Sequence, residues 1–84
     1  MHFACVPQFY FHVLDDLDIP DDEGAVLADL GAARDHAVRA ARVLMSETLV
    51  KVGKITLHHC IDIEDESHDT VETVTFDDAV AIIH

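Results

Sequence analysis

The pattern of hydrophobic and polar positions in the first third of the chain predicts a pair of strands. Residues 9–14 are aromatic and β-branched, which favours a strand. Six acidic residues fill the segment 15–24 together with Pro20 and Gly24, a composition typical of a turn. The short apolar run 25–28 then predicts a second strand. We expect the two strands to pair as a hairpin with a wide loop.

The next segment has the apolar period of an α-helix, from Leu30 to about Leu49, and Asp29 is a suitable N-cap. It is rich in Ala, Arg, Leu and Met, which are strong helix formers. At about 100° per residue, one face of this helix collects Leu30, Ala33, Ala37, Ala40, Ala41, Leu44 and Thr48. Because most of these side chains are small, we expect the helix to lie close to a sheet.

The last third predicts two more strands. Residues 54–63 alternate, with Ile55, Leu57, His59, Ile61 and Ile63 on one side and Thr56, His58, Cys60 and Asp62 on the other. A polar turn, 64–69, leads to the Thr- and Val-rich segment 70–76. Asp77 is a candidate cap for a terminal stub that includes a short helix.

The order β-β-α-β-β predicts an α+β fold, in which one long helix packs on a small, largely antiparallel four-stranded sheet. We expect a single domain, 1–84, with an N-terminal extension at 1–7, a core at 8–76 and a C-terminal stub at 77–84.

A single helix covers one face of such a sheet and leaves the other face open. Eight residues are candidates for this open face: Tyr10, His12, Leu14, Thr56, His58, Cys60, Val74 and Phe76. If its apolar members were contiguous, burial in a two-fold dimer would be favourable. We therefore predict a homo-oligomer.

Charge narrows the classes of function. The 84 residues include 17 acids and five Lys or Arg, for a formal net charge of −12. Nucleic acids and anionic membranes are therefore not expected partners. All five cations lie within 34–54, and three of them form a stripe on the predicted helix. The stripe consists of Arg34, Arg39 and Arg42. We predict that it takes part in protein interaction together with three residues of the open face, Tyr10, His12 and His58.

Further features indicate a cytoplasmic protein that does not associate with membranes. The longest apolar runs fall short of the roughly 18 residues needed to span a bilayer. The opening stretch 1–14 has no Lys or Arg, unlike a secretory signal. Cys5 and Cys60 are too few for a disulfide scaffold.

Seven histidines raise the hypothesis of a metal site. His12, His58 and Cys60 could bind zinc if their strands were adjacent and in register; the alternative is that the histidines are half-buried polar residues of the open or dimer face. Cys60 and His58 also form a candidate nucleophile and base. Their spacing along a strand is nearly 7 Å, with about 3.3 Å of rise per residue. Because no glycine-rich oxyanion loop accompanies them, we expect no enzymatic activity and no cofactor.

Several motifs together resemble a small bacterial domain family of unknown function. They are Phe9-Tyr10-Phe11-His12-Val13, then Asp21-Asp22-Glu23-Gly24, then Ala28-Asp29-Leu30 with Ala33 and Ala37. Members of that family typically have a Tyr-Phe-Phe-His-Val strand, an Asp-Glu-Glu-Gly turn and an Asp-Leu-x-x-Ala helix. The resemblance covers about residues 8–76 and departs at 65–69, where the family often has Asp-Glu-Asp-Gly. It implies a fold and no particular activity.

The sequence therefore predicts a small acidic protein that acts as a non-enzymatic, homo-oligomeric protein-interaction module. The alternative is an antitoxin-like regulator or toxin-neutralising partner of the HicB type, to which the arrangement of sheet and helix is also similar. The Gly/Thr signature that usually precedes the helix of those proteins is missing here, and no DNA-binding tail follows.

Overall fold

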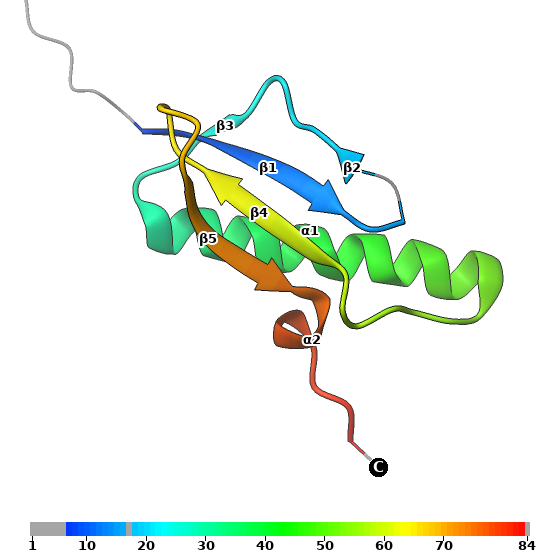
Figure 1. The fold of residues 1–84 in the computed structure, drawn as a ribbon. Coiled ribbons are helices and arrows are strands. Elements are labelled where there is room, and N and C mark those ends of the chain that lie inside the picture. The colour runs from blue at the N-terminus through cyan, green and yellow to red at the C-terminus, as the bar shows by residue number, and fades with distance from the viewer. Residues whose placement is uncertain (1–6, 17, 84) are drawn as a thin grey trace, which may run out of the picture.

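The computed structural model describes residues 7–16 and 18–83, so the predicted N-terminal extension lies outside the described residues except for Pro7. The elements are β1 (Gln8–Leu14), β2 (Asp18–Ile19), β3 (Ala25–Val26), α1 (Leu30–Val52), β4 (Cys60–Glu64), β5 (Thr70–Thr75) and α2 (Phe76–Ala79). Helix α1 crosses one face of the sheet (Figure 1). The α+β fold and the order strand-strand-helix-strand-strand are confirmed.

The sheet is antiparallel throughout and has the order β2-β1-β4-β5, with β3 also paired to β1. The short strands β2 and β3 lie beside opposite ends of β1, where Leu14 pairs with Asp18 and Gln8 pairs with Val26. The predicted hairpin is therefore present. Its wide loop contributes an extra strand, β2, which the acidic composition of 15–24 did not indicate.

Helix α1 begins at the N-cap that the sequence predicts, and Gly53 closes its C-terminal end. The Asp29 carboxylate accepts the N–H of Ala32 at 2.8 Å, and Gly53, at φ +72°, donates its N–H to the Leu49 carbonyl. The helix is longer than predicted because it continues to Val52.

The buried stripe of α1 differs in part from the predicted face. Its members recur every four residues and are Ala33, Ala37, Ala41 and Met45. Ala40 and Leu44 are half-buried, whereas Leu30 and Thr48 are exposed. The stripe follows the part of the helix that lies under the sheet, so the two ends of the predicted face are left in solvent.

The sheet supplies large side chains against this stripe of small ones. Residues from three strands and α2 complete the core: Phe9, Phe11, Ile61, Ile63, Val74, Phe76 and Ala79. Alternation along each strand brings these residues to the helix side. The alanines of α1 let the helix approach the sheet closely enough for these larger groups to fill the space between them.

The strand predicted at 54–63 is wrong over its first half. Strand β4 begins at Cys60, and residues 54–59 connect α1 to it. β1 ends at Leu14, which pairs with Cys60, so the sheet offers no neighbouring strand on that side before residue 60. Alternation in this segment instead lets Ile55 and Leu57 pack against the core from a connecting loop.

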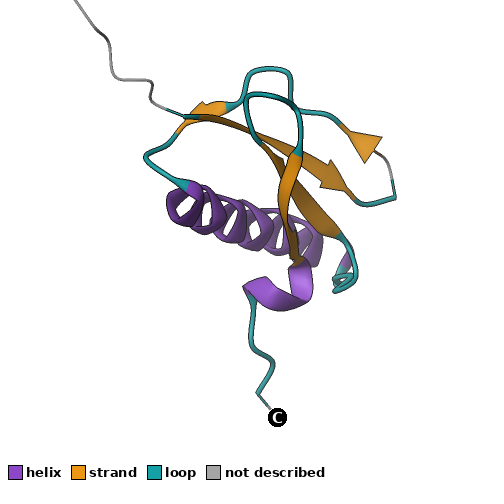
Figure 2. Cartoon of the chain, turned by 60° about the vertical axis from the view of Figure 1, so that its left-hand side comes forward, coloured by secondary structure: helices purple, strands orange, loops and turns teal. Residues whose placement is uncertain are grey.

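The predicted open face also needs correction. Val74 pairs with Ile61 and is fully buried beneath α1, and Phe76 begins α2 and is also buried. The open side therefore holds mainly polar side chains, and it lacks the contiguous apolar patch that the dimer prediction assumed. In Figure 2, α1 lies on one side of the strands and the connecting loops rise on the other.

The C-terminal stub contains α2, but its N-cap lies two residues earlier than predicted. Thr75, not Asp77, accepts the N–H of Asp78 through its hydroxyl at 3.1 Å. Asp77 and Asp78 occupy the first turn instead, where carboxylates favour the positive end of a helix. The helix ends at Ala79, so residues 80–83 are not helical.

Candidate functional site

His12 lies at the centre of the polar open face and connects two segments of the chain. It projects from β1 on the side away from α1. Its Nδ1 accepts the backbone N–H of Asp21 at 3.0 Å, and its Nε2 lies 2.9 Å from Oε1 of Glu64 on β4. Since Nδ1 accepts a hydrogen bond, the neutral ring carries its proton on Nε2, which is buried beside the Glu64 carboxylate.

Asp21 fixes the acidic loop onto β1. Its Oδ2 accepts the N–H of Phe11, and its Oδ1 accepts the N–H groups of Glu23 and Gly24, all at 3.1 Å. Partial burial acts to raise the pKa of Asp21, but the backbone donors of Gly24, Phe11 and Glu23 and the nearby His12 outweigh it and lower the pKa.

Gly24 allows the same loop to approach the strand. It has φ +71°, and a Cβ at this position would lie 2.7 Å from the carbonyl oxygen of Phe9. The two motifs of the resemblance, the strand 9–13 and the turn 21–24, thus meet in space. Their polar residues bind one another's backbone, which is a structural role.

Glu64 connects His12 to the β4–β5 turn. The hydrogen bond from His12 is the main cause of a lowered Glu64 pKa; desolvation opposes it, and a contact with His68 at 3.2 Å adds to it. The Tyr10 ring packs on His68 with centroids 5.0 Å apart. We call Tyr10, His12, Asp21, Glu64 and His68 the sheet-face cluster.

The structure does not bring the three predicted zinc ligands into one group. His12 is engaged with Asp21 and Glu64, Cys60 pairs with Leu14, and His58 is exposed in the 54–59 connection, edge-on to His59. Within residues 7–16 and 18–83, no group of three or more His, Cys, Asp or Glu side chains is placed to hold a metal ion.

The predicted nucleophile and base are also unfavourably placed. Burial raises the pKa of the half-buried Cys60 thiol, and the charge of Asp62 raises it further. A raised pKa reduces the thiolate fraction at neutral pH. His58 precedes β4 instead of lying on the same strand face as Cys60, so the geometry on which the pairing was based is not present.

Two of the three predicted interaction arginines make contacts within the domain. Arg34 Nη1 binds Oε2 of Glu72 on β5 at 2.8 Å, and Arg42 Nε donates to the Ala79 carbonyl at 2.7 Å. These contacts attach α1 to β5 and to α2. Arg39 is exposed. These arginines thus serve partly to hold the domain together.

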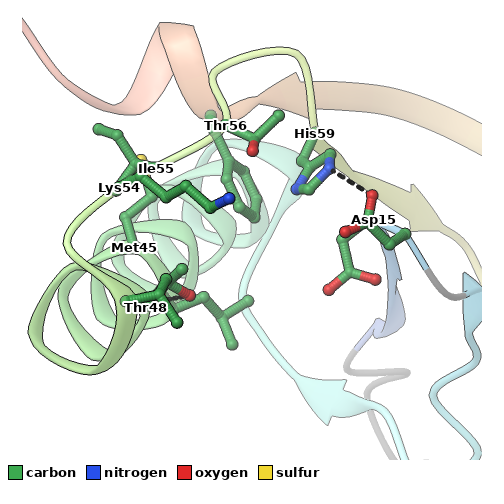
Figure 3. A pocket seen from close by; sticks show the side chains of 11 residues that line it. Asp15, Met45, Thr48, Lys54, Ile55, Thr56 and His59 are labelled. Atoms are coloured by element: carbon green, nitrogen blue, oxygen red, sulfur yellow. Dashed lines mark hydrogen bonds and ion pairs between the residues drawn. The ribbon is translucent and has the colours of Figure 1, made fainter.

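A cleft of about 330 Å³ lies where α1 continues past the ends of the strands (Figure 3). Met45, Ile55 and Phe76 contribute an apolar floor, and Lys54 and His59 contribute polar groups. His59 Nε2 lies 3.5 Å from Oδ1 of Asp16 in the β1–β2 turn. The sequence did not predict this cleft, because its alternation placed His59 on a strand. The features that pointed to a cleft here were the acidic turn and the length of the helix.

These features define a class of small α+β domain in which one long helix covers an antiparallel sheet and a histidine links the sheet to an acidic loop. Residues 8–77 match the family described as a domain of unknown function (DUF6894), and the chain belongs to that family. Comparison with curated proteins finds no match, and comparison with solved structures finds none. No described helix is long and apolar enough to cross a membrane.

Proposed function

We propose that this domain is a non-enzymatic protein-interaction module that self-associates as a homodimer. The observation that supports it is the exposure of large apolar side chains. Ten Ile, Leu and Val residues among those described are between 38 and 91% exposed. Three of them, Leu49, Val50 and Val52, gather in the last turn of α1. Grouped apolar exposure of this kind marks surfaces that contact other proteins.

The polar side chains support a non-enzymatic role. The side chains of His12 and Asp21, which a catalytic site could use, bind backbone groups or one another. The Cys60 thiol is half-buried and has a raised pKa. General acid–base and nucleophilic catalysis need such groups beside a substrate, and the pKa of the catalytic group must lie close to the working pH. Their use as structural links favours a binding role.

The distribution of charge limits where a second copy can bind. All five Lys and Arg lie within 34–54, whereas 15 of the 17 acids lie outside this segment. The net charge of −12 on each copy opposes association, so the contact must occur where charges are few or neutralised.

Sedimentation velocity over a wide concentration range tests this proposal. The expected result is a monomer–dimer equilibrium whose dimer fraction rises with concentration. The same series at high salt screens the repulsion between copies and serves as an internal control. A species that remains monomeric at every concentration and at both salt levels would refute self-association.

A further inference from the structure

The sheet has two edges, and they differ in length and charge. One edge is formed by β2 and β3, which have two residues each; β2 lies within the acidic segment 15–24, and β3 follows it directly. The other edge is β5, with six residues, and no strand of the described chain lies beyond it. A second copy that approached the first edge would bring two acidic loops together, so β5 is the more accessible edge.

The backbone groups along the outer side of β5 can be identified. The Phe76 N–H donates to the His59 carbonyl, and these two residues continue the register of the β4–β5 pair. In antiparallel pairs, bonding to one neighbour alternates along a strand. Glu72 and Val74 therefore face β4. The N–H and C=O groups of Thr73 and Thr75 point outward from the sheet, whereas Val71 is the extra residue of a bulge and interrupts the alternation.

β5 lacks most of the features that usually keep an edge strand from pairing. Its sequence, Thr-Val-Glu-Thr-Val-Thr, contains no Lys and no Pro, and five of its six residues are β-branched. The single charge, on Glu72, is turned to the helix side and neutralised by Arg34 at 2.8 Å. A bulge, which is one of these protective features, affects only the start of the strand, where Val71 is the extra residue opposite Ile63 and Glu64. The outer edge is thus nearly neutral on a strongly acidic molecule.

We propose that β5 is the dimer interface and pairs antiparallel with β5 of a second copy around Thr73, an inference that rests on the self-association proposed above. This register places Thr73 opposite itself, so that its outward-facing backbone groups meet those of the second copy and exchange two hydrogen bonds. It places Thr75 opposite the bulge residue Val71. Glu72 lies opposite Val74, so no strand acid faces another acid.

The same register makes the pairing sensitive to salt. Asp69 and Asp77, which flank the strand, would lie opposite each other at both ends of the interface. Their repulsion adds to that of two bodies with a net charge of −12 each. The dimer therefore forms more tightly as ionic strength rises, unlike one held by ion pairs.

Substitution at an exposed position of β5 tests the interface. Val71 is 40% exposed, and V71K places the side chain that commonly protects edge strands beside the predicted partner. We expect the dissociation constant of the dimer to rise at least about tenfold. V43K is the matched control, since Val43 is 55% exposed on α1 and the same change in charge is made away from β5. It should leave the dimer unchanged.

A second variant and a second measurement separate loss of pairing from loss of folding. T73P removes an outward N–H that β4 does not use, so it should weaken the dimer while the monomer keeps its circular dichroism spectrum. Amide exchange at Thr73 and Thr75 should slow as the dimer forms. A dimer that V71K and T73P leave intact overturns the β5 interface but not self-association. A monomeric wild type overturns both.

Discussion

His12 illustrates how a residue that suggests chemistry in the sequence becomes structural in the fold. A histidine within an aromatic strand is a reasonable metal ligand or base as long as its neighbours are unknown. In the structure its Nδ1 accepts the Asp21 N–H, and its Nε2 is buried 2.9 Å from the Glu64 carboxylate. The ring thereby holds the acidic loop, β1 and β4 together, and this accounts for its place in the motif.

Replacing His12 by alanine should therefore destabilise the domain. H12A leaves the Asp21 N–H without its acceptor in a half-buried position, and a buried polar group without a partner costs about 1–3 kcal/mol. Urea unfolding followed by circular dichroism measures the change. The control is H58A, because His58 is exposed and a surface substitution usually changes stability by less than about 0.5 kcal/mol. Equal stability of the two variants would contradict the linking role of His12.

The lowered pKa values of Asp21 and Glu64 predict a loss of stability in acid. Their ordinary values are 3.8 and 4.5, and the folded-state values lie below these. Each carboxylate thus stabilises the fold above its ordinary pKa, and the contribution is lost as the pH falls through that value towards the lower folded one. The free energy of unfolding should fall below about pH 4.5.

Substitution of Glu64 tests which carboxylate is responsible. E64Q retains a hydrogen-bond acceptor but cannot titrate, so its stability should fall less steeply with acid than that of the wild type. E47Q changes an exposed carboxylate of α1 and should keep the wild-type slope. Urea unfolding at a series of pH values makes the comparison. Identical slopes for E64Q and the wild type would show that Glu64 does not contribute.

At the scale of the elements, the small residues of α1 determine how closely the helix lies on the sheet. Ala33, Ala37 and Ala41 are fully buried, and the large side chains that meet them come from the strands. The spacing of four residues brings these alanines to one face, so the contact follows from the helix period. This part of the fold could be predicted from the sequence because it depends on local geometry.

A larger side chain in this stripe should separate the helix from the sheet. We expect A37L to destabilise the domain by about 1–3 kcal/mol, because inserted methylenes force the packed side chains out of their rotamers. Thermal unfolding measures the effect. K51L introduces the same side chain at an exposed position of α1 and should change stability by less than about 0.5 kcal/mol. A stability of A37L equal to that of the wild type would mean that the helix adapts without cost.

The segment 54–63 shows where prediction from pattern failed at this scale. Its alternation was correct, since Ile55, Leu57, Ile61 and Ile63 all contribute to the core or pack against it. A strand also needs a neighbour for its backbone, and β1 ends opposite Cys60. The presence of that neighbour depends on the length of a strand nearly fifty positions earlier in the chain. The alternation alone therefore could not place the start of β4.

For the whole molecule, the segregation of charge predicts how the association of copies responds to solvent. Each copy has a net charge of −12, and the proposed β5 interface contains a single, internally neutralised acid per copy. Screening should strengthen the dimer, since the Debye length shortens to about 3 Å at 1 M salt from about 10 Å at 0.1 M. Sedimentation equilibrium at several salt concentrations measures this. A dimer that weakens steadily with salt would contradict a nearly neutral interface.

The candidate site was only partly predictable from the sequence. His12 and Tyr10 were correctly placed on the face away from the helix because strand alternation determines it. Glu64 and Asp21 were not connected to His12, since the register between β1 and β4 and the return of the acidic loop are set by contacts across long separations. The cleft near His59 was missed for the same reason.

The sequence by itself determined the buried alanine stripe of α1, the start of the helix at Asp29 and the order of the main elements. These depend on periods and turn chemistry that act over a few residues. The tertiary structure alone decided the register, which buried Val74 and left a polar open face, and the exposure of β5 as the long free edge. The physical reason is that strand pairing joins residues far apart in the chain, and a local pattern does not specify which residues meet.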